Sequence, residues 1–120
     1  MTQTVLAIDD SLTVRELVNF VLGNAGYKVV LAEDGVDGLA QLEHVTPDVI
    51  ITDINMPRLD GFGFIARARE TKARATPILV LTTEGDAEKK ARAKAAGATG
   101  WIIKPFNPNQ LVEAVRRVAQ

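Results

Sequence analysis

Polar side chains follow four short apolar segments of this chain, each at the point where the segment ends. Asp9 and Asp10 end the first segment, Asp53 ends a later one, and Thr82 and Lys104 end two more. If these segments are strands of one parallel sheet, their carboxyl ends meet at the edge where ligands of open α/β sheets bind. The five side chains can therefore converge on a single site.

Three carboxylates gathered at one edge would repel one another and would raise one another's pKa values unless a positive charge lay among them. A bound cation resolves this repulsion. Zinc is disfavoured, because the chain has no cysteine and its single histidine lies away from these positions. A set of oxygen ligands suits a hard cation such as Mg²⁺, which often shares phosphate oxygens. We therefore expect Asp9, Asp10 and Asp53 to form a Mg²⁺ site.

Lys104 and Thr82 indicate what such a metal would help to hold. A lysine beside a hydroxyl and a metal site suits an anion with several oxygens, and a phosphoryl group has this form. Mg²⁺ and Lys104 would neutralise its charge, and Thr82 would donate a hydrogen bond. A carboxylate could be the nucleophile that accepts the group as an aspartyl phosphate. The predicted chemistry is phosphoryl transfer to an aspartate.

The segments that position these residues are rich in Val, Ile and Leu, and each precedes a longer amphipathic or alanine-rich stretch. Several are apolar throughout, which is typical of strands in a parallel sheet with helices on both faces. The sequence therefore predicts an α/β fold with a doubly wound five-stranded parallel sheet, as one domain over residues 1–120. The expected strands are TVLAID (4–9), YKVVLA (27–32), DVIITDI (48–54), PILVLTT (77–83) and GWIIK (100–104).

The helices between these segments carry their own signals. Thr13 with Glu16 fits a capping box for the helix after the first strand. Asn107 can cap the last helix, with Pro108 at its first position. The stretch 86–97 offers only alanines for burial, so its contact with the sheet should be close but small in apolar area. A helix held in this way could shift.

Composition narrows the classes of function. The formal net charge of -1 gives no basic excess of the kind that nucleic-acid binding requires. Without cysteine, the chain has neither disulfides nor thiolate chemistry. The N-terminus lacks the basic segment of a secretory signal, and no stretch approaches the roughly 18 apolar residues that span a bilayer. We expect a cytoplasmic protein that binds neither nucleic acid nor membrane.

The set Asp9, Asp10, Asp53, Thr82 and the run KPF from Lys104, on five βα units, resembles the receiver domain of two-component response regulators. Each motif alone is common, but five matched positions in the right order at successive strand ends are specific. The resemblance covers the whole chain and implies a flavodoxin-like (βα)5 fold with strand order 2-1-3-4-5. It also implies that Asp53 accepts a phosphoryl group from a phosphohistidine of a partner histidine kinase.

The resemblance assigns roles to the neighbours of the acceptor. Asp9 and Asp10 resemble the acidic pair that holds Mg²⁺ together with Asp53, and Asn55 would add its backbone carbonyl to the metal. The positions of Asn55 and Glu84 beside the site also resemble those in family members that lose their phosphoryl group quickly. The resemblance therefore implies that these two residues tune dephosphorylation.

Further positions resemble the activation machinery of the family. Lys104 would contact the phosphoryl group, and Thr82 would be the hydroxyl that moves toward it. Thr82 is preferred to Thr83 because alternation leaves only one of the two facing the site. Trp101 occupies the place of the aromatic that changes rotamer with this hydroxyl, where the family usually has Tyr or Phe. The Lys104–Pro105 peptide is expected to be cis, which an X-Pro bond adopts at modest cost.

Within the family, the segments TTEGD and GATGWIIKPF are similar to the single-domain chemotaxis regulators of the CheY type. In that branch the phosphorylated form binds the flagellar motor switch through the fourth helix, fifth strand and fifth helix. This implies a monomeric phosphorylation switch, not an enzyme with a separate substrate. A stand-alone receiver that acts as a phosphate sink or phosphorelay intermediate is the alternative.

Two other classes of protein share this architecture. An aspartate-dependent phosphohydrolase also uses an Asp nucleophile and Mg²⁺, but Asn55 stands where its general acid would be. An FMN carrier has the same strand order, but three carboxylates would repel the flavin phosphate. Steady turnover of phosphate monoesters would favour the first class, and a coloured protein would favour the second.

Overall fold

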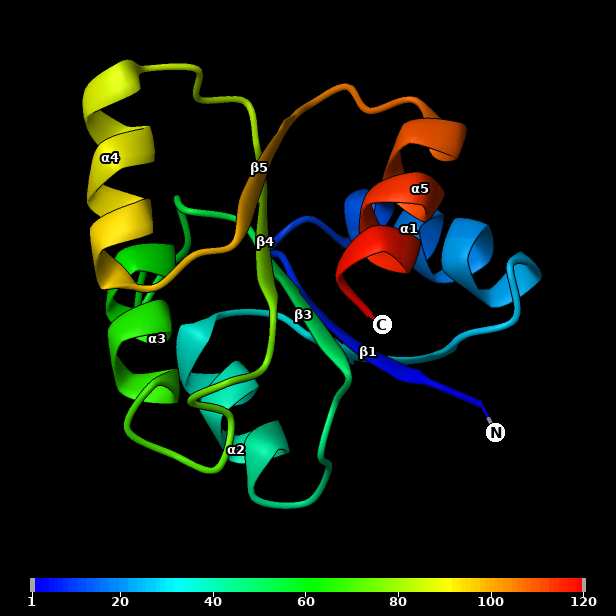
Figure 1. Cartoon of the computed structure of the whole chain (residues 1–120), viewed down its shortest axis with the longest axis horizontal. Helices are drawn as coiled ribbons and strands as arrows, with labels where there is room; N and C mark the ends of the chain where they lie inside the picture. The colour runs from blue at the N-terminus through cyan, green and yellow to red at the C-terminus, as the bar shows by residue number, and fades with distance from the viewer. Residues whose placement is uncertain (1, 120) are drawn as a thin grey trace.

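The computed structural model describes residues 2–119, in which strands and helices alternate along the chain (Figure 1). None of the helices in this range is long and apolar enough to cross a membrane. The strands are β1 (Thr4–Ile8), β2 (Lys28–Ala32), β3 (Val49–Thr52), β4 (Ile78–Thr82) and β5 (Gly100–Ile103). The helices are α1 (Leu12–Asn24), α2 (Gly35–Leu42), α3 (Gly61–Ala68), α4 (Ala87–Ala96) and α5 (Pro108–Val118). The prediction of five βα units is confirmed.

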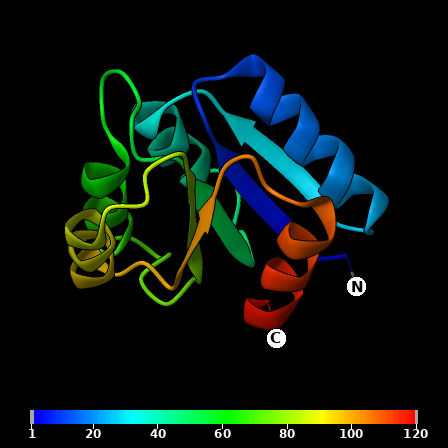
Figure 2. The same ribbon diagram turned by 90° about the horizontal axis from the view of Figure 1, so that it is seen from above.

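The five strands form one parallel sheet in the order β2-β1-β3-β4-β5. Helices α1 and α5 cover one face, and α2, α3 and α4 cover the other (Figures 1 and 2). The order reverses between β1 and β3, which are neighbours in the sheet. A doubly wound sheet has its ligand crevice at such a switch point, beyond the carboxyl ends of the two strands. Both the predicted fold class and the strand order are confirmed.

The central strands are apolar throughout because each face of the sheet has its own core. In β1, Val5 and Ala7 pack with α1 and α5, whereas Leu6 and Ile8 pack with residues of α2, α3 and α4. Every residue of β3 and β4 is buried. The edge strands β2 and β5 are only partly buried, since each has one neighbouring strand.

The start of α1 differs from the predicted capping box. Ser11 is the N-cap, and its Oγ accepts a hydrogen bond from the backbone N–H of Val14 at 3.3 Å. Thr13 therefore lies inside the first turn, and the prediction that it caps the helix with Glu16 is wrong. Serine is at least as good an N-cap as threonine. Ser11 also lies two residues closer to the end of β1, so the helix begins before Thr13.

The predicted cap of the last helix and the predicted alanine-only burial of the stretch 86–97 are confirmed. Asn107 caps α5, with Pro108 as the first helical residue. Helix α4 buries only Ala93. A second contact comes from Arg92, whose guanidinium lies 4.0 Å from the centroid of the Phe62 ring on α3. This cation–π contact joins the two helices without adding to the apolar core.

Candidate functional site

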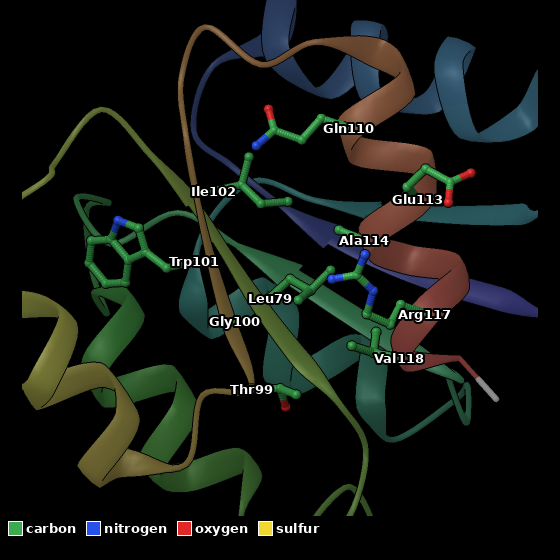
Figure 3. Close-up of a pocket in the computed structure, with 10 residues that line it drawn as sticks. All are labelled: Leu79, Thr99, Gly100, Trp101, Ile102, Gln110, Glu113, Ala114, Arg117 and Val118. Carbon is green, nitrogen blue, oxygen red and sulfur yellow. The ribbon is translucent and has the colours of Figure 1, made fainter.

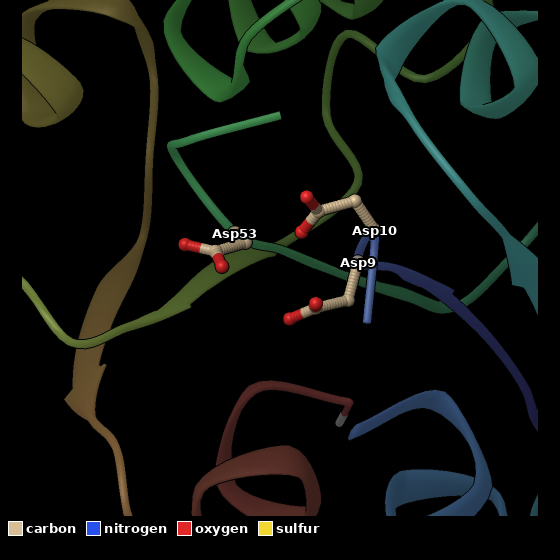
Figure 4. Close-up of side chains that lie close together, drawn as sticks. All are labelled: Asp9, Asp10 and Asp53. Atoms are coloured by element: carbon tan, nitrogen blue, oxygen red, sulfur yellow. The ribbon is translucent and has the colours of Figure 1, made fainter. Parts of the chain in front are cut away.

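The acidic residues predicted from the sequence meet at the switch point of the sheet. One carboxylate oxygen from each of Asp9, Asp10 and Asp53 lies within 4.8 Å of the other two, and the three side chains gather at the ends of β1 and β3 (Figure 4). Asp9 and Asp53 are 5% and 8% exposed, whereas Asp10 is exposed. Two of the three carboxylates are therefore held where ionisation needs a compensating charge.

Lys104 supplies that charge in this structure. Its Nζ donates hydrogen bonds to Oδ2 of Asp9 at 2.7 Å and to Oδ2 of Asp53 at 2.8 Å. Burial would lower the pKa of Lys104, but the bonds to Asp53 and Asp9 outweigh it and raise this pKa above its ordinary value. Burial also raises the pKa of Asp9, and the Lys104 ammonium opposes that rise only in part. One ammonium is shared between two buried carboxylates.

Backbone groups fix both carboxylates from the other side. Oδ1 of Asp9 accepts a hydrogen bond from the Ser11 N–H at 2.9 Å, and Oδ1 of Asp53 accepts one from the Ile54 N–H at 2.6 Å. The guanidinium of Arg15, on α1, also donates to the carbonyl oxygen of Asp9 at 2.7 Å. Each carboxylate therefore presents Oδ2 to Lys104 in a defined orientation.

Gly61 and Arg15 are structural neighbours of the site that sequence reasoning missed. A Cβ at Gly61 would collide with the carbonyl oxygen of Asp53, and the Gly61 N–H donates to the Ile54 carbonyl at 2.8 Å. The Asp60-Gly61 pair has the composition of a turn, which concealed this close approach. The sequence does not single out Arg15, because an arginine in the first turns of a helix after a strand is common and need not contact the strand end.

Thr82 and Thr83 have different environments at the end of β4. Thr82 is fully buried, and its Oγ1 accepts a hydrogen bond from the Glu84 N–H at 3.3 Å, whereas Thr83 is exposed. The backbone carbonyl of Thr82 also accepts a hydrogen bond from the Lys104 N–H at 2.8 Å. Thr82 is therefore the inward-facing threonine beside the lysine. The Lys104–Pro105 peptide is cis.

Trp101 does not lie among the carboxylates. Its half-buried indole points toward α4, on the opposite side of β5 from α5 (Figure 3). The indole Nε1 donates a hydrogen bond to the carbonyl oxygen of Glu84 at 2.9 Å. Because the N–H of the same residue bonds the Thr82 hydroxyl, Glu84 joins Trp101 to Thr82 through its backbone. A shift of either side chain acts on the same short loop.

The side chain of Glu84 links this loop to two other elements. Its Oε1 accepts a hydrogen bond from Nδ2 of Asn55 at 3.1 Å and lies 3.1 Å from Nζ of Lys89, on α4. Contact with Lys89, and then with Asn55, holds the pKa of Glu84 below its ordinary value. Asn55, two residues after Asp53, is exposed. The Asn55–Glu84 pair therefore lies across the loops that follow β3 and β4.

The fold and this cluster define a doubly wound α/β domain with a candidate cation site at its switch point. The sequence pattern of the response regulator receiver domain matches residues 5–116. The chain therefore belongs to the receiver domain family of two-component response regulators. Members of this family interact with histidine kinases and phosphotransfer partners.

Solved structures of receiver domains have the same fold. The chemotaxis protein CheY4 of Vibrio cholerae is 47% identical, with a TM-score of 0.94 over 98% of this chain and 99% of that one. The receiver domain of a sensor histidine kinase from Pseudomonas aeruginosa PAO1 is 26% identical, with a TM-score of 0.91 over 99% of this chain and 98% of that one. The latter structure has a magnesium ion coordinated in its active site cleft.

Curated relatives include proteins with other roles. The phosphate regulon transcriptional regulatory protein PhoB of Escherichia coli is 36% identical, over 98% of this chain and 52% of that protein. Protein PilG of Pseudomonas aeruginosa is 34% identical, over 93% of this chain and 84% of that protein. The chain spans about half the length of PhoB and of the transcriptional regulator ycf27 of Guillardia theta.

The raised pKa of Asp9 makes a testable prediction about stability. Because the folded-state pKa exceeds the unfolded one, stability falls as pH rises through the folded pKa and Asp9 ionises beside Asp53 and Asp10. Asp9→Asn removes this cost, and its single amide oxygen keeps one of the two bonds that Asp9 accepts, from Lys104 or from the Ser11 N–H. In metal-free buffer we expect the variant to melt at a higher temperature than the wild type at pH 7.

The melting temperatures of Asp9→Asn and the wild type are also compared in acid, to test whether ionisation of Asp9 causes the difference. At about pH 3, where an ordinary aspartate is mostly protonated, the advantage of Asp9→Asn should disappear. Asp10→Asn, the same substitution at the exposed carboxylate, should give a smaller gain. If Asp9→Asn instead melts at a lower temperature than the wild type at pH 7, the assignment of Asp9 as a destabilised carboxylate is wrong.

Proposed function

We propose that this receiver domain is a phosphorylation switch in which Asp53 accepts a phosphoryl group from a histidine kinase. The observation that carries the proposal is the position of Lys104, which bridges Asp9 and Asp53 at the switch point. A fixed cation beside a buried carboxylate suits stabilisation of the charge on a transferred phosphoryl group. We also propose that the domain acts in the cytoplasm.

The donor set favours Mg²⁺ as the cofactor. Asp9, Asp10 and Asp53 offer only oxygen atoms, which suit a hard cation, and the backbone carbonyl of Asn55 would be a fourth protein ligand. Two of the carboxylates share one ammonium, so the cluster retains uncompensated negative charge to attract a cation. When bound, Mg²⁺ would neutralise charge on the phosphoryl oxygens.

The proposed transfer is a single displacement at phosphorus. A carboxylate oxygen of Asp53 attacks the phosphorus, a P–O bond forms, and the P–N bond to the donor imidazole breaks. The donor nitrogen keeps the electron pair and takes up a proton, so the imidazole leaves neutral. Lys104, which donates a hydrogen bond to Oδ2 of Asp53, would move its ammonium to a phosphoryl oxygen. The domain thus accepts the group without acting on a separate substrate.

The network around Glu84 supports a route from the acceptor to the surface. Thr82 would move its hydroxyl toward the phosphoryl group, and this movement would break its bond to the Glu84 N–H. The bond from Trp101 to the Glu84 carbonyl would then shift, and the Lys89–Glu84 contact would carry the change to α4. Because α4 buries only Ala93, its displacement costs little apolar contact. Asn55 and Glu84, which flank the acceptor, would tune the rate of hydrolysis.

We propose chemotaxis as the process, with the flagellar motor switch protein as the output partner of a monomeric regulator. The support is the similarity to CheY4 over nearly the full length of both chains. The surface between β5 and α5 also carries a groove of about 350 Å³, lined by Gly100, Gln110 and Arg117 among others (Figure 3). A phosphorylation-dependent change at α4 and β5 would alter this surface.

Removal of the acceptor tests the proposed chemistry directly. With acetyl phosphate and Mg²⁺, intact-mass spectra of the wild type should show one added phosphoryl group that hydroxylamine removes. Asp53→Asn should abolish the adduct. The matched control is Asp60→Asn, which changes an exposed aspartate of the same loop and keeps a good cap for α3. The same adduct in Asp53→Asn, or none in the wild type, would refute the assignment.

Trp101 should report the switch, because it is the only tryptophan and bonds the loop that contains Glu84. We expect its emission spectrum to change when the wild type is phosphorylated and to stay constant when Asp53→Asn receives the same treatment. Occupancy is measured by mass on the same sample. An unchanged spectrum at full occupancy would remove Trp101 from the mechanism.

Binding to the motor switch protein tests the proposed output. The purified phosphorylated domain should bind it more tightly than the unphosphorylated domain, and Asp53→Asn should show no difference with or without the phosphodonor. Equal, negligible binding of both forms would contradict a motor output. Return of the phosphoryl group from Asp53 to a phosphotransfer histidine would then favour the phosphate-sink or phosphorelay function.

A further inference from the structure

The loop between β3 and α3, residues 53–60, contains an unusual backbone conformation. It begins with the acceptor Asp53 and includes Asn55. Arg58 has φ of 67°, the one positive φ outside glycine among residues 2–119. A side chain with a Cβ is disfavoured in this region, so such a residue persists only where surrounding contacts hold it. Contacts of Arg58 must therefore contribute to the shape of this loop.

The principal contact is an ion pair with a buried carboxylate. Nε of Arg58 donates to Oδ2 of Asp34 at 2.6 Å, and the Asp34 side chain is only 4% exposed. Oδ1 of Asp34 accepts a hydrogen bond from the Asp37 N–H at 2.8 Å, so Asp34 is also the N-cap of α2. Burial would raise the pKa of Asp34, but Arg58 and the Asp37 N–H hold it below its ordinary value.

The backbone of Leu59, next to Arg58, contacts the first residue of α2. The Gly35 N–H donates to the carbonyl oxygen of Leu59 at 3.2 Å. A Cβ at Gly35 would lie 2.9 Å from Cβ of Leu59, so only glycine allows this approach. The second half of the loop is therefore held against α2, while the first half carries Asp53, a member of the acidic cluster, and Asn55, whose Nδ2 donates to Glu84.

We propose that the Arg58–Asp34 pair is a positioning pair for the metal site, which holds the loop so that the Asn55 carbonyl faces the carboxylate cluster. The proposal rests on the proposed function, because it assumes that a cation binds there. Arg58 itself is not a ligand. The pair acts through the loop, because it holds Arg58 at a positive φ that its backbone would otherwise not adopt.

Mg²⁺ binding to the full chain tests this role without any phosphorylation. The dissociation constant is measured from backbone amide shifts of residues 53–56 during titration with MgCl₂. Arg58→Ala should weaken binding roughly tenfold, the lower end of the effect of groups that orient metal ligands. Asp34→Asn, which keeps a capping oxygen for α2, should weaken it by a similar factor. The double variant should bind no more weakly than either single variant.

Two further variants separate the ion pair from other effects. Glu33→Gln changes the exposed carboxylate that lies 3.8 Å from Arg58, and it should bind Mg²⁺ as the wild type does. Arg58→Gly removes the side chain and also the backbone cost of positive φ, so it should bind Mg²⁺ more tightly than Arg58→Ala but more weakly than the wild type. Wild-type affinity in Arg58→Gly would show that backbone preference, not the ion pair, positions the loop.

Thermal unfolding of the same variants distinguishes positioning from general stabilisation. If Arg58→Ala and Asp34→Asn lower the melting temperature but retain wild-type affinity for Mg²⁺, the inference is wrong and the proposed function stands. If the wild type itself binds no Mg²⁺, both the inference and the proposed metal site are refuted.

Discussion

The site depends on one ammonium group shared between two buried carboxylates. Lys104 lies 2.7 Å from Asp9 and 2.8 Å from Asp53, and all three side chains are largely removed from water. Such an arrangement needs a compensating charge beside the carboxylates, because an isolated buried ion is very unfavourable. One lysine does not neutralise two aspartates, and Asp10 adds a third negative charge beside them. The cluster is thus held together and also left able to attract a cation.

The fold is what brings these charges together. Asp9, Asp53 and Lys104 follow β1, β3 and β5, whose carboxyl ends lie along one edge of the sheet. The neighbouring positions of β1 and β3 place the two buried carboxylates side by side. Backbone N–H groups of Ser11 and Ile54 then orient each carboxylate. The same edge carries Thr82, whose hydroxyl accepts a hydrogen bond from the Glu84 N–H, and the Glu84 carbonyl in turn accepts one from the Trp101 indole on β5.

Local patterns predicted the parallel α/β fold and the composition of the site, whereas the strand order followed from the resemblance to receiver domains. Continuous apolar segments such as DVIITDI indicate central strands, and charged residues at their ends indicate the ligand edge. The helix start at Ser11 was missed because Ser11 and Thr13 can both cap a helix. Only the geometry at the end of β1 selects Ser11. The ion pair of Arg58 with Asp34 joins residues 24 apart through the fold, so no local pattern reveals it.

The shared lysine is the central claim, and the free energy of unfolding of Lys104→Met tests it most directly. In metal-free buffer we predict a loss of about 3 kcal/mol, since removal of one partner leaves buried carboxylates uncompensated. Saturating Mg²⁺ should restore most of this loss, because a cation replaces the missing charge. Lys94→Met, at an exposed lysine of α4, is the matched control and should have the stability of the wild type both without metal and with Mg²⁺. Wild-type stability of Lys104→Met without metal, or no recovery with Mg²⁺, would contradict this account.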